Sequence, residues 1–446
     1  MKAIVKKSVL SGHIIVPGSK SYTIRALILA AMADGTSHIS NPLPSNDCLS
    51  TAAAVRKVGA EVDFGDNNVW TVRGAGAGLH LPGDPIDVGN SGSLMYFLCP
   101  VLSTLPGECT FTGDESICRR PVNHLIDALC QFGANGRSLN NGPDGEPGTT
   151  PPFSFCGPIE VNKKLVTEGA LSQYISGFMM AASRLNGTLN MELTNPKETP
   201  YLTMTKLWLE SVGVPVEISP DFKHIAVTGP VPFKAFDRAV PSDWEGVAFP
   251  LVAALISGSE ITIDNVDGSG SQGDDKIVEV LQSVGADIEW QRKEEKLVVR
   301  GGKVLSTAGL PNGELVIEMS SFPDAICALA VAACFMEGKV IFTDIDICRK
   351  KETDRIKAMV SELTKLGAKL VDEGDRLVVY GDGGRSLHGG EVESYKDHRI
   401  VMSLACLGLG LSDSEKVIVN DAEWCSVTFP NFFEAMNKLG AGFETI

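Results

Sequence analysis

Basic side chains recur in this sequence where polar loops open apolar helices. Four loops share the feature: Lys20 and Arg25 in PGSKSYTIR (17–25), Arg120 in TGDESICRRP (112–121), Arg355 in KETDR (351–355) and Arg399 in YKDHR (395–399). A helix N-terminus already carries a partial positive charge, so extra cations there are unfavourable unless an anion binds among them. The spacing therefore predicts a site for small anionic ligands.

The segment 349–363 indicates how one such loop is built. Lys351 and Arg355 are four residues apart, so a helix would place both on one side, with Glu352 next to Arg355. A solvated run of salt bridges is the common alternative for this pattern. The apolar residues begin only after Arg355, which places the charged cluster at the start of the expected helix and favours an anion site.

These loops belong to a pattern that occurs six times along the chain. In each repeat a helix-like segment ends in an apolar residue and a glycine, and usually enters a strand; the glycines are Gly59, Gly133, Gly213, Gly285, Gly367 and Gly440. Glycine suits the left-handed residue that follows a helix. A second helix of each repeat is apolar nearly all round and should lie in the core. Six repeats exceed one core, so we predict two globular domains of three repeats each.

Composition excludes several classes of protein. The 446 residues include 39 basic and 55 acidic side chains, for a net charge of −16, which disfavours nucleic acid and acidic membranes as partners. No apolar run is long enough to span a bilayer, and the N-terminal segment lacks the apolar core of a signal peptide. The 11 cysteines form no C-x-x-C pair, so we expect reduced thiols in the cytoplasm and no metal site.

Taken together, the motifs resemble those of the enolpyruvyl transferases, in the branch that uses shikimate 3-phosphate. The resemblance rests on motifs that follow the family order across almost the whole chain: PGSKSYTIRAL, VGNSGS, TGDESICRRP, LSQY, ETPY, FPDA, KETDR and DHR. It implies an α/β fold of the inverse α/β prism type, with two domains that each contain three βαβαββ repeats. Residues 1–18 and 241–446 would form one domain, residues 19–240 the other, and the active site would lie in the cleft between them.

The reaction implied by the resemblance transfers the enolpyruvyl (carboxyvinyl) group of phosphoenolpyruvate to the 5-hydroxyl of shikimate 3-phosphate and releases phosphate. It proceeds by addition and elimination, and it serves aromatic amino-acid biosynthesis in the shikimate pathway. A base must take the hydroxyl proton, and an acid must protonate the methylene carbon. Asp324 matches the base of the family, and Glu352 and Lys20 match its proton donor and the partner of that donor. No cofactor or metal is implied, and we expect a cytoplasmic monomer.

The resemblance also assigns the binding residues. Those for phosphoenolpyruvate would be Lys20, Asn90, Gly92, Arg120, Gln173, Arg355 and Arg399. Those for shikimate 3-phosphate would be Lys20, Ser21, Arg25, Ser172, Gln173, Tyr201, Asp324 and Lys351.

Several family positions differ in this chain. Leu171 and Glu198 stand where the family usually binds the 3-phosphate of the acceptor, Tyr96 replaces an arginine, and Val427 replaces a lysine found in some members. The D-x-S-S-A motif of the family reads DWEGV. The phosphoenolpyruvate side is thus better preserved than the acceptor side.

Two alternatives stay open at this point. The first is an enolpyruvyl transferase with another acceptor, either UDP-N-acetylglucosamine or an acceptor without a phosphate. Against UDP-N-acetylglucosamine, Ser21 stands where that branch usually has asparagine, and Cys118 does not match its catalytic cysteine in spacing. The second alternative is a non-catalytic anion-binding protein, which would have no need of Lys20, Asp324 and Glu352 together.

Overall fold

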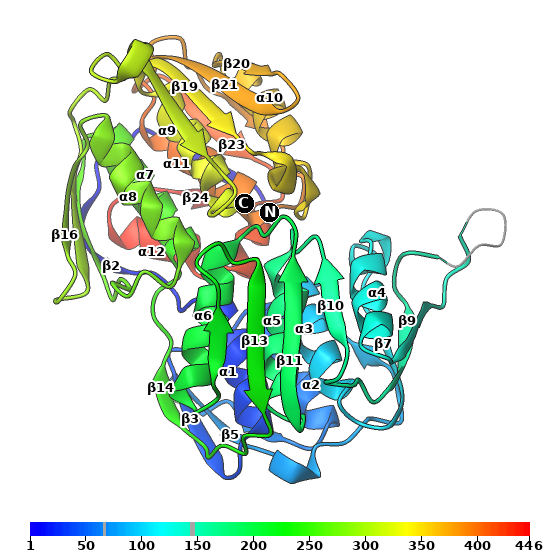
Figure 1. Cartoon of the computed structure of the whole chain (residues 1–446). Helices are drawn as coiled ribbons and strands as arrows, with labels where there is room; N and C mark the ends of the chain where they lie inside the picture. Colours follow the sequence, from blue (N-terminus) through cyan, green and yellow to red (C-terminus); the bar gives the residue numbers. More distant parts are fainter. Residues whose placement is uncertain (66–67, 143–147) are drawn as a thin grey trace. The chain divides into compact units, whose positions relative to one another are not determined.

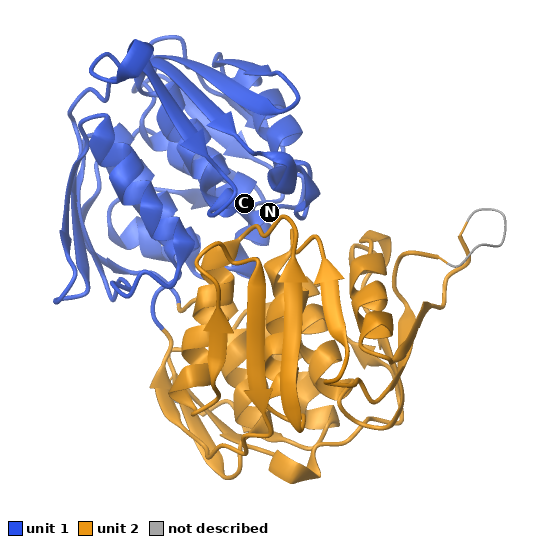
Figure 2. Ribbon diagram, viewed as in Figure 1, with its two compact units in different colours: residues 1–17, 241–446 blue, residues 18–240 orange. Residues whose placement is uncertain are grey.

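The structure is a computed structural model that describes residues 1–65, 68–142 and 148–446. The chain forms two compact units, coloured separately in Figure 2. Unit 1 comprises residues 1–17 and 241–446, and unit 2 comprises residues 18–240. Each unit has its own apolar core, and the two cores share no residue.

One sheet topology recurs six times in the described part of the chain. Each sheet has four strands, of which the first two are parallel and the remaining neighbours antiparallel. In unit 2 the sheets are β14 (Asp237–Ala239), β3 (Thr36–Ser40), β5 (Val69–Arg73), β4 (Glu61–Asp63); β6 (Ile86–Asp87), β7 (Gly107–Thr112), β9 (Phe153–Gly157), β8 (Asn135–Ser138); and β10 (Lys164–Thr167), β11 (Gly187–Leu193), β13 (His224–Gly229), β12 (Val216–Ile218).

Unit 1 repeats the pattern with both ends of the chain. β1 pairs antiparallel with β23 and β24, and β2 pairs parallel with β15, so the N-terminal strands complete two sheets whose other strands come from the C-terminal half. The sheets are β22 (Gly390–Val392), β23 (Lys416–Val419), β1 (Ala3–Lys6), β24 (Glu444–Thr445); β2 (Ser11–Ile15), β15 (Glu260–Asp264), β17 (Lys296–Arg300), β16 (Asp287–Gln291); and β18 (Glu314–Glu318), β19 (Glu337–Thr343), β21 (Arg376–Asp382), β20 (Lys369–Asp372).

The apolar helices lie inside the units, as their composition predicts. In unit 2, α3 and α5 pack against each other, and Figure 1 shows them behind the strands β11 and β13. The inner helices are α1 (Lys20–Met32), α3 (Gly92–Leu102), α5 (Ser172–Ala182), α7 (Trp244–Ser257), α9 (Ile326–Cys334) and α11 (His398–Leu409). Nearly all of their residues are buried, which explains why these segments read as apolar on every side.

The second helix of each repeat is half-exposed and is followed by the glycine that the repeat pattern singled out. All six glycines have a positive φ, between 88° at Gly213 and 112° at Gly59. The helices are α2 (Asn46–Lys57), α4 (Asn123–Gln131), α6 (Thr199–Ser211), α8 (Lys276–Ser283), α10 (Arg355–Lys365) and α12 (Phe432–Lys438). The predicted mixed α/β class with six repeats is therefore confirmed.

Two local expectations are corrected by the structure. Arg355 is the first residue of α10 and Asp354 is its N-cap, so Lys351 and Glu352 lie in the loop before the helix and not on a helix face. Proline suits the first position of a helix, so the sequence predicts that the helix after Arg120 begins at Pro121, but it begins at Asn123. In both cases the polar residues extend further from the helix than the sequence pattern suggests.

Candidate active site

The candidate site in unit 1 is a network of charged side chains centred on Asp324. This residue lies in a short 3-10 turn (Pro323–Ala325) that leads into α9. One carboxylate oxygen, Oδ1, accepts hydrogen bonds from Arg355 Nη1 at 2.5 Å and from Arg399 Nε at 3.0 Å, and Oδ2 accepts one from Lys351 Nζ at 3.1 Å. Three cations, one from a loop and two from helix starts, thus meet at one carboxylate.

These cations decide the charge state of Asp324. Burial by itself raises the pKa of this carboxyl, but the charges of Lys351 and Arg355 outweigh burial and hold the pKa at about 2. Asp324 is therefore ionised at neutral pH. In the absence of an anionic ligand it is a weak base, because the surrounding cations stabilise the carboxylate.

Arg355 is held in place by two further carboxylates. Its Nε donates to Asp397 Oδ2 at 2.8 Å, and its Nη2 donates to Glu352 Oε2 at 2.7 Å. Asp397 is also the N-cap of α11, where it accepts from the backbone N–H of Arg399 at 2.8 Å. The side chains of Arg355 and Asp397 are fully buried. Asp397 therefore fixes both the arginine and the start of the helix that carries Arg399.

Arg399 has a second acidic partner that the sequence did not reveal. Its Nη2 forms an ion pair with Glu245 Oε2, and both side chains are largely buried. Glu245 lies in the first turn of α7, within the DWEGV segment that departs from the family motif. An acidic residue suits a helix N-terminus, so its presence there gave no sign of the distant arginine.

In unit 2, Arg120 and Asn90 form one group. Arg120 Nη2 donates to Asn90 Oδ1 at 2.8 Å and to Ser116 Oγ at 3.1 Å, and Asn90 Nδ2 donates to Asp114 Oδ2 at 2.8 Å. Gly92 begins α3 beside them, and a Cβ on Gly92 would lie 3.4 Å from Arg120 Nη1. A residue larger than glycine at position 92 would therefore crowd the Arg120 guanidinium.

Tyr96, which replaces the arginine of the family, supports the same group. Its hydroxyl donates to the carbonyl oxygen of Pro121 at 3.2 Å, the residue directly after Arg120. The His124 ring lies between the rings of Tyr96 and Tyr174, with centroids 5.2 and 5.0 Å away, and burial lowers the His124 pKa to about 4. Tyr96 thus ties α3 to the arginine loop through a neutral contact.

Arg25 connects three helices of unit 2 and is almost fully buried. Its Nε donates to Thr205 Oγ1 at 2.8 Å, and its Nη1 donates to the Ser21 carbonyl at 3.0 Å. Nη2 reaches Ser176 Oγ at 3.4 Å and the Tyr201 carbonyl at 3.3 Å. Arg25 therefore positions α1, α5 and α6. Its positive charge lies close to Ser21 and Tyr201, two of the residues predicted to bind the acceptor.

The side-chain carboxylate of Glu198 lies at the N-terminus of α5, although the residue itself directly precedes α6. Its Oε2 accepts from the Ser172 backbone N–H at 3.4 Å and from Ser172 Oγ at 3.2 Å, and the residue is only 3% exposed. The N-cap residue itself, Leu171, makes no side-chain hydrogen bond to the helix. Burial lowers the pKa of Arg25 to about 10, and the charge of Glu198 is among those that raise it again.

The remaining predicted residues of unit 2 lie at helix starts. Lys20 is the first residue of α1, and its Nζ lies 3.5 Å from Asp47 Oδ2, with both side chains largely buried. Gln173 follows Ser172 in the first turn of α5. Tyr201 lies in the first turn of α6.

The predicted residues thus fall into groups within each unit. Unit 1 joins five of them into one hydrogen-bonded network: Asp324, Lys351, Glu352, Arg355 and Arg399. Unit 2 joins Asn90 with Arg120, and Arg25 with Ser21 and Tyr201. The partners missed by the sequence are Asp397, Glu245 and Asp47, which pair with Arg355, Arg399 and Lys20 from far along the chain, and Asp114, which accepts a hydrogen bond from Asn90.

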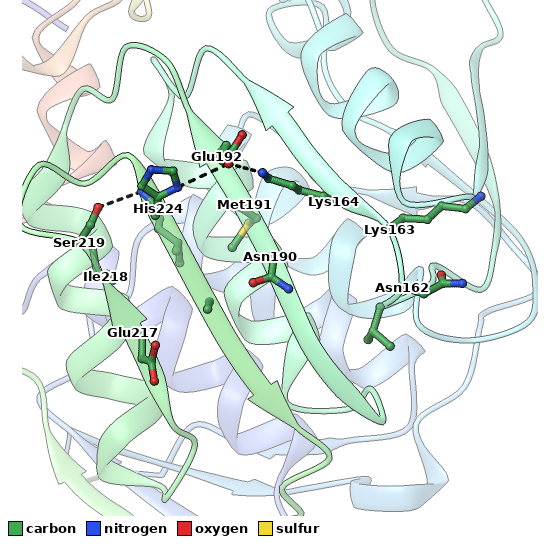
Figure 3. Close-up of a pocket in the computed structure, with 13 residues that line it drawn as sticks. Asn162, Lys163, Lys164, Asn190, Met191, Glu192, Glu217, Ile218, Ser219 and His224 are labelled. Atoms are coloured by element: carbon green, nitrogen blue, oxygen red, sulfur yellow. Dashed lines mark hydrogen bonds and ion pairs between the residues drawn. The ribbon is translucent and has the colours of Figure 1, made fainter.

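A separate cavity lies on the sheet β10-β11-β13-β12 of unit 2, with a volume of about 490 Å³ (Figure 3). Lys164 and Glu192 form an ion pair on it, and His224 Nδ1 lies 3.7 Å from Glu192 Oε1. None of the predicted site residues lines this cavity.

In the described ranges, no group of three or more His, Cys, Asp or Glu side chains is arranged to hold a metal ion. Likewise, none of the described helices is long and apolar enough to cross a membrane.

Comparisons with known proteins by family model, by sequence and by structure agree with one another. The family model for EPSP synthase (3-phosphoshikimate 1-carboxyvinyltransferase) matches residues 4–436. The 3-phosphoshikimate 1-carboxyvinyltransferases of Ruminiclostridium cellulolyticum and Methanococcus aeolicus are 36% and 35% identical, and each match covers 99% of both chains. A solved EPSP synthase from Acinetobacter baumannii superimposes with a TM-score of 0.82 at 28% identity, over 99% of both chains.

Proposed function

The chain belongs to the EPSP synthase (3-phosphoshikimate 1-carboxyvinyltransferase) family, and from this we propose which of its residues carry the reaction. The enzyme transfers the enolpyruvyl group of phosphoenolpyruvate to shikimate 3-phosphate in the shikimate pathway (EC 2.5.1.19). Its substrates are small anions, so the task of the fold is to hold cations where anions bind.

The observation that carries the assignment is the network around Asp324. Lys351, Arg355 and Arg399 all donate to one carboxylate, and further carboxylates fix the two arginines. Arginine presents planar pairs of N–H donors that match a carboxylate or phosphate. We assign phosphoenolpyruvate binding to Arg355, Arg399, Arg120, Asn90 and Gly92.

Ligand binding also makes Asp324 a better base. Its pKa is about 2 because of neighbouring cations. When anionic phosphoenolpyruvate neutralises these cations, the carboxylate loses that stabilisation and its pKa rises. Asp324 then takes the proton of the acceptor 5-hydroxyl as the hydroxyl oxygen bonds to C2 of phosphoenolpyruvate.

The acid step falls to Glu352 and Lys20. A proton delivered to C3 turns the methylene group into a methyl group and completes the tetrahedral adduct. In the elimination, the methyl group gives up a proton and the C–O bond to phosphate breaks, which restores the double bond. The acceptor is held by Ser21, Arg25, Ser172, Gln173, Tyr201 and Lys351, and Arg25 also braces the helix starts around it.

Phosphate release tests this function and its alternatives together. The enzyme is supplied with phosphoenolpyruvate and, in parallel, shikimate 3-phosphate, shikimate or UDP-N-acetylglucosamine. We expect turnover with shikimate 3-phosphate. Turnover only with another acceptor would overturn the acceptor assignment, and binding of phosphoenolpyruvate without any turnover would support a non-catalytic relative.

The same proposal includes a cytoplasmic monomer. The eleven cysteines are free in the structure, which suits a reducing compartment. Each unit completes three four-stranded sheets from this one chain, so the fold of a unit needs no strand from a second copy. Light scattering coupled to gel filtration should give a mass near 47.4 kDa, and a mass of twice that value would contradict the monomer.

A further inference from the structure

Glu198 has an unusual backbone for the residue that precedes a helix. It is the N-cap residue of α6, but its φ of 50° and ψ of 36° lie in the left-handed region, which a residue with a Cβ rarely adopts. Its own side chain does not cap α6. The carboxylate instead contacts another helix, because Glu198 Oε2 receives hydrogen bonds from Ser172 at the start of α5.

The carboxylate therefore takes the part of a bound anion at α5. It accepts from one backbone N–H and one hydroxyl of Ser172, which are the kinds of donor that a phosphate uses at a helix N-terminus. Its charge also acts on the buried guanidinium of Arg25, where it offsets part of the effect of burial. The backbone conformation, the hydrogen bonds to Oε2 and the charge effect on Arg25 are thus all features of this one residue.

This arrangement competes with a phosphorylated acceptor. The proposed function places the acceptor on Ser172 and Gln173, next to Arg25. A phosphate that uses the Ser172 donors meets a carboxylate that already holds them, and two anions that share one set of donors repel each other. The acceptor must move the Glu198 carboxylate aside or bind with fewer donors.

We propose that Glu198 is a specificity-determining residue, an internal carboxylate that the acceptor phosphate must displace from Ser172. The Glu198 carboxylate weakens binding of a phosphorylated acceptor. It thereby lowers the ratio of kcat/KM for that acceptor to kcat/KM for its unphosphorylated form. This inference rests on the proposed function, because it requires that the acceptor uses the start of α5.

The test compares Glu198→Gln and Glu198→Ser with the native enzyme. Removal of one buried charge from a hydrogen-bonded anion position is expected to lower the KM for shikimate 3-phosphate about tenfold. The ratio of kcat/KM for shikimate 3-phosphate to that for shikimate should rise by a similar factor, while the KM for phosphoenolpyruvate stays within about twofold. A merely structural role would not separate the two substrates in this way.

Glu210→Gln is the matched control, because it removes one negative charge from the same helix at an exposed pair with Lys206. It should change none of these constants. Glu198→Gln keeps the size of the side chain, so it tests the charge even where Glu198→Ser fails to fold. An unchanged or raised KM for shikimate 3-phosphate in Glu198→Gln would overturn the inference. Absence of turnover with that acceptor in the native enzyme would instead overturn the proposed function.

Discussion

A single carboxylate, Asp324, receives hydrogen bonds from three cationic side chains and links them into one network. These cations were predictable as a set, because each stands in a polar loop near a helix start. Their acidic partners were not, because an isolated Glu245 or Asp397 reads as an ordinary helix-start residue until the fold brings the arginine to it. Long-range charge pairing is a tertiary property that local sequence does not encode.

Asp324→Asn should remove the base and leave the anion site in place. We expect kcat to fall by about 10²- to 10⁴-fold, since this is the usual contribution of a positioned base. Equilibrium binding of phosphoenolpyruvate should persist, because Arg355 and Arg399 remain. Stopped-flow turnover and calorimetry on the same sample check both statements; turnover within a few-fold of the native rate would exclude Asp324 as the base.

The lowered pKa of Asp324 predicts a pH dependence of stability. A carboxyl whose pKa drops on folding, here from 3.8 to about 2, stabilises the folded state above the unfolded pKa. That contribution, of about 2 kcal/mol, should be lost as the pH falls from about 4 to about 2. Urea unfolding across this range should show a shallower loss in Asp324→Asn than in Asp413→Asn, an exposed control. Equal slopes would contradict the assignment.

At the scale of elements, the six repeats were predictable because each outer helix ends at a glycine with a positive φ. The exact helix starts were not. Lys351 and Glu352 have helical spacing from Arg355, but Asp354 caps α10 and leaves both in the loop. The capping residue Asp354 is in the sequence, but it stands in a charged segment (349–355) that only Thr353 interrupts, so it is not recognisable as a cap.

Gly213→Ala isolates the cost of the left-handed position. A Cβ there meets no atom within 4 Å, so only the backbone at a φ of 88° opposes it. The free energy of unfolding should fall by about 1 kcal/mol. Gly78→Ala is the control, because Gly78 also has open space but no positive φ. Equal unfolding midpoints for the two variants would show that the turn does not require glycine.

Tyr96→Phe tests the link between α3 and the arginine loop. Loss of the hydrogen bond to the Pro121 carbonyl should let Arg120 move and raise the KM for phosphoenolpyruvate about fivefold. The KM for shikimate 3-phosphate should not change, which distinguishes a positioning role from general loosening. Tyr380→Phe, an exposed position in unit 1, serves as the control. Equal increases in both KM values would argue against the role.

At the scale of the whole molecule, the chain carries a net charge of −16 and handles two anionic substrates. The fold resolves this conflict locally, because helix starts in both units gather cations while most acidic residues lie elsewhere. Among the acidic residues at these groups, Glu198 and Glu245 stand where the family motifs have other residues: Glu198 accepts hydrogen bonds from Ser172, and Glu245 pairs with Arg399. The family motifs revealed the cations, and only the structure revealed that Glu245 forms an ion pair with Arg399 and that Glu198 binds Ser172.

The most direct test of the account follows one reaction in D₂O by proton and phosphorus NMR. With phosphoenolpyruvate and shikimate 3-phosphate, we predict inorganic phosphate, an enolpyruvyl ether on the 5-oxygen and deuterium in its methylene group, because the route passes through a methyl group. Glu352→Gln should slow the appearance of all three signals. A product without deuterium in its methylene group, or a product that forms only with another acceptor, would contradict the proposed reaction.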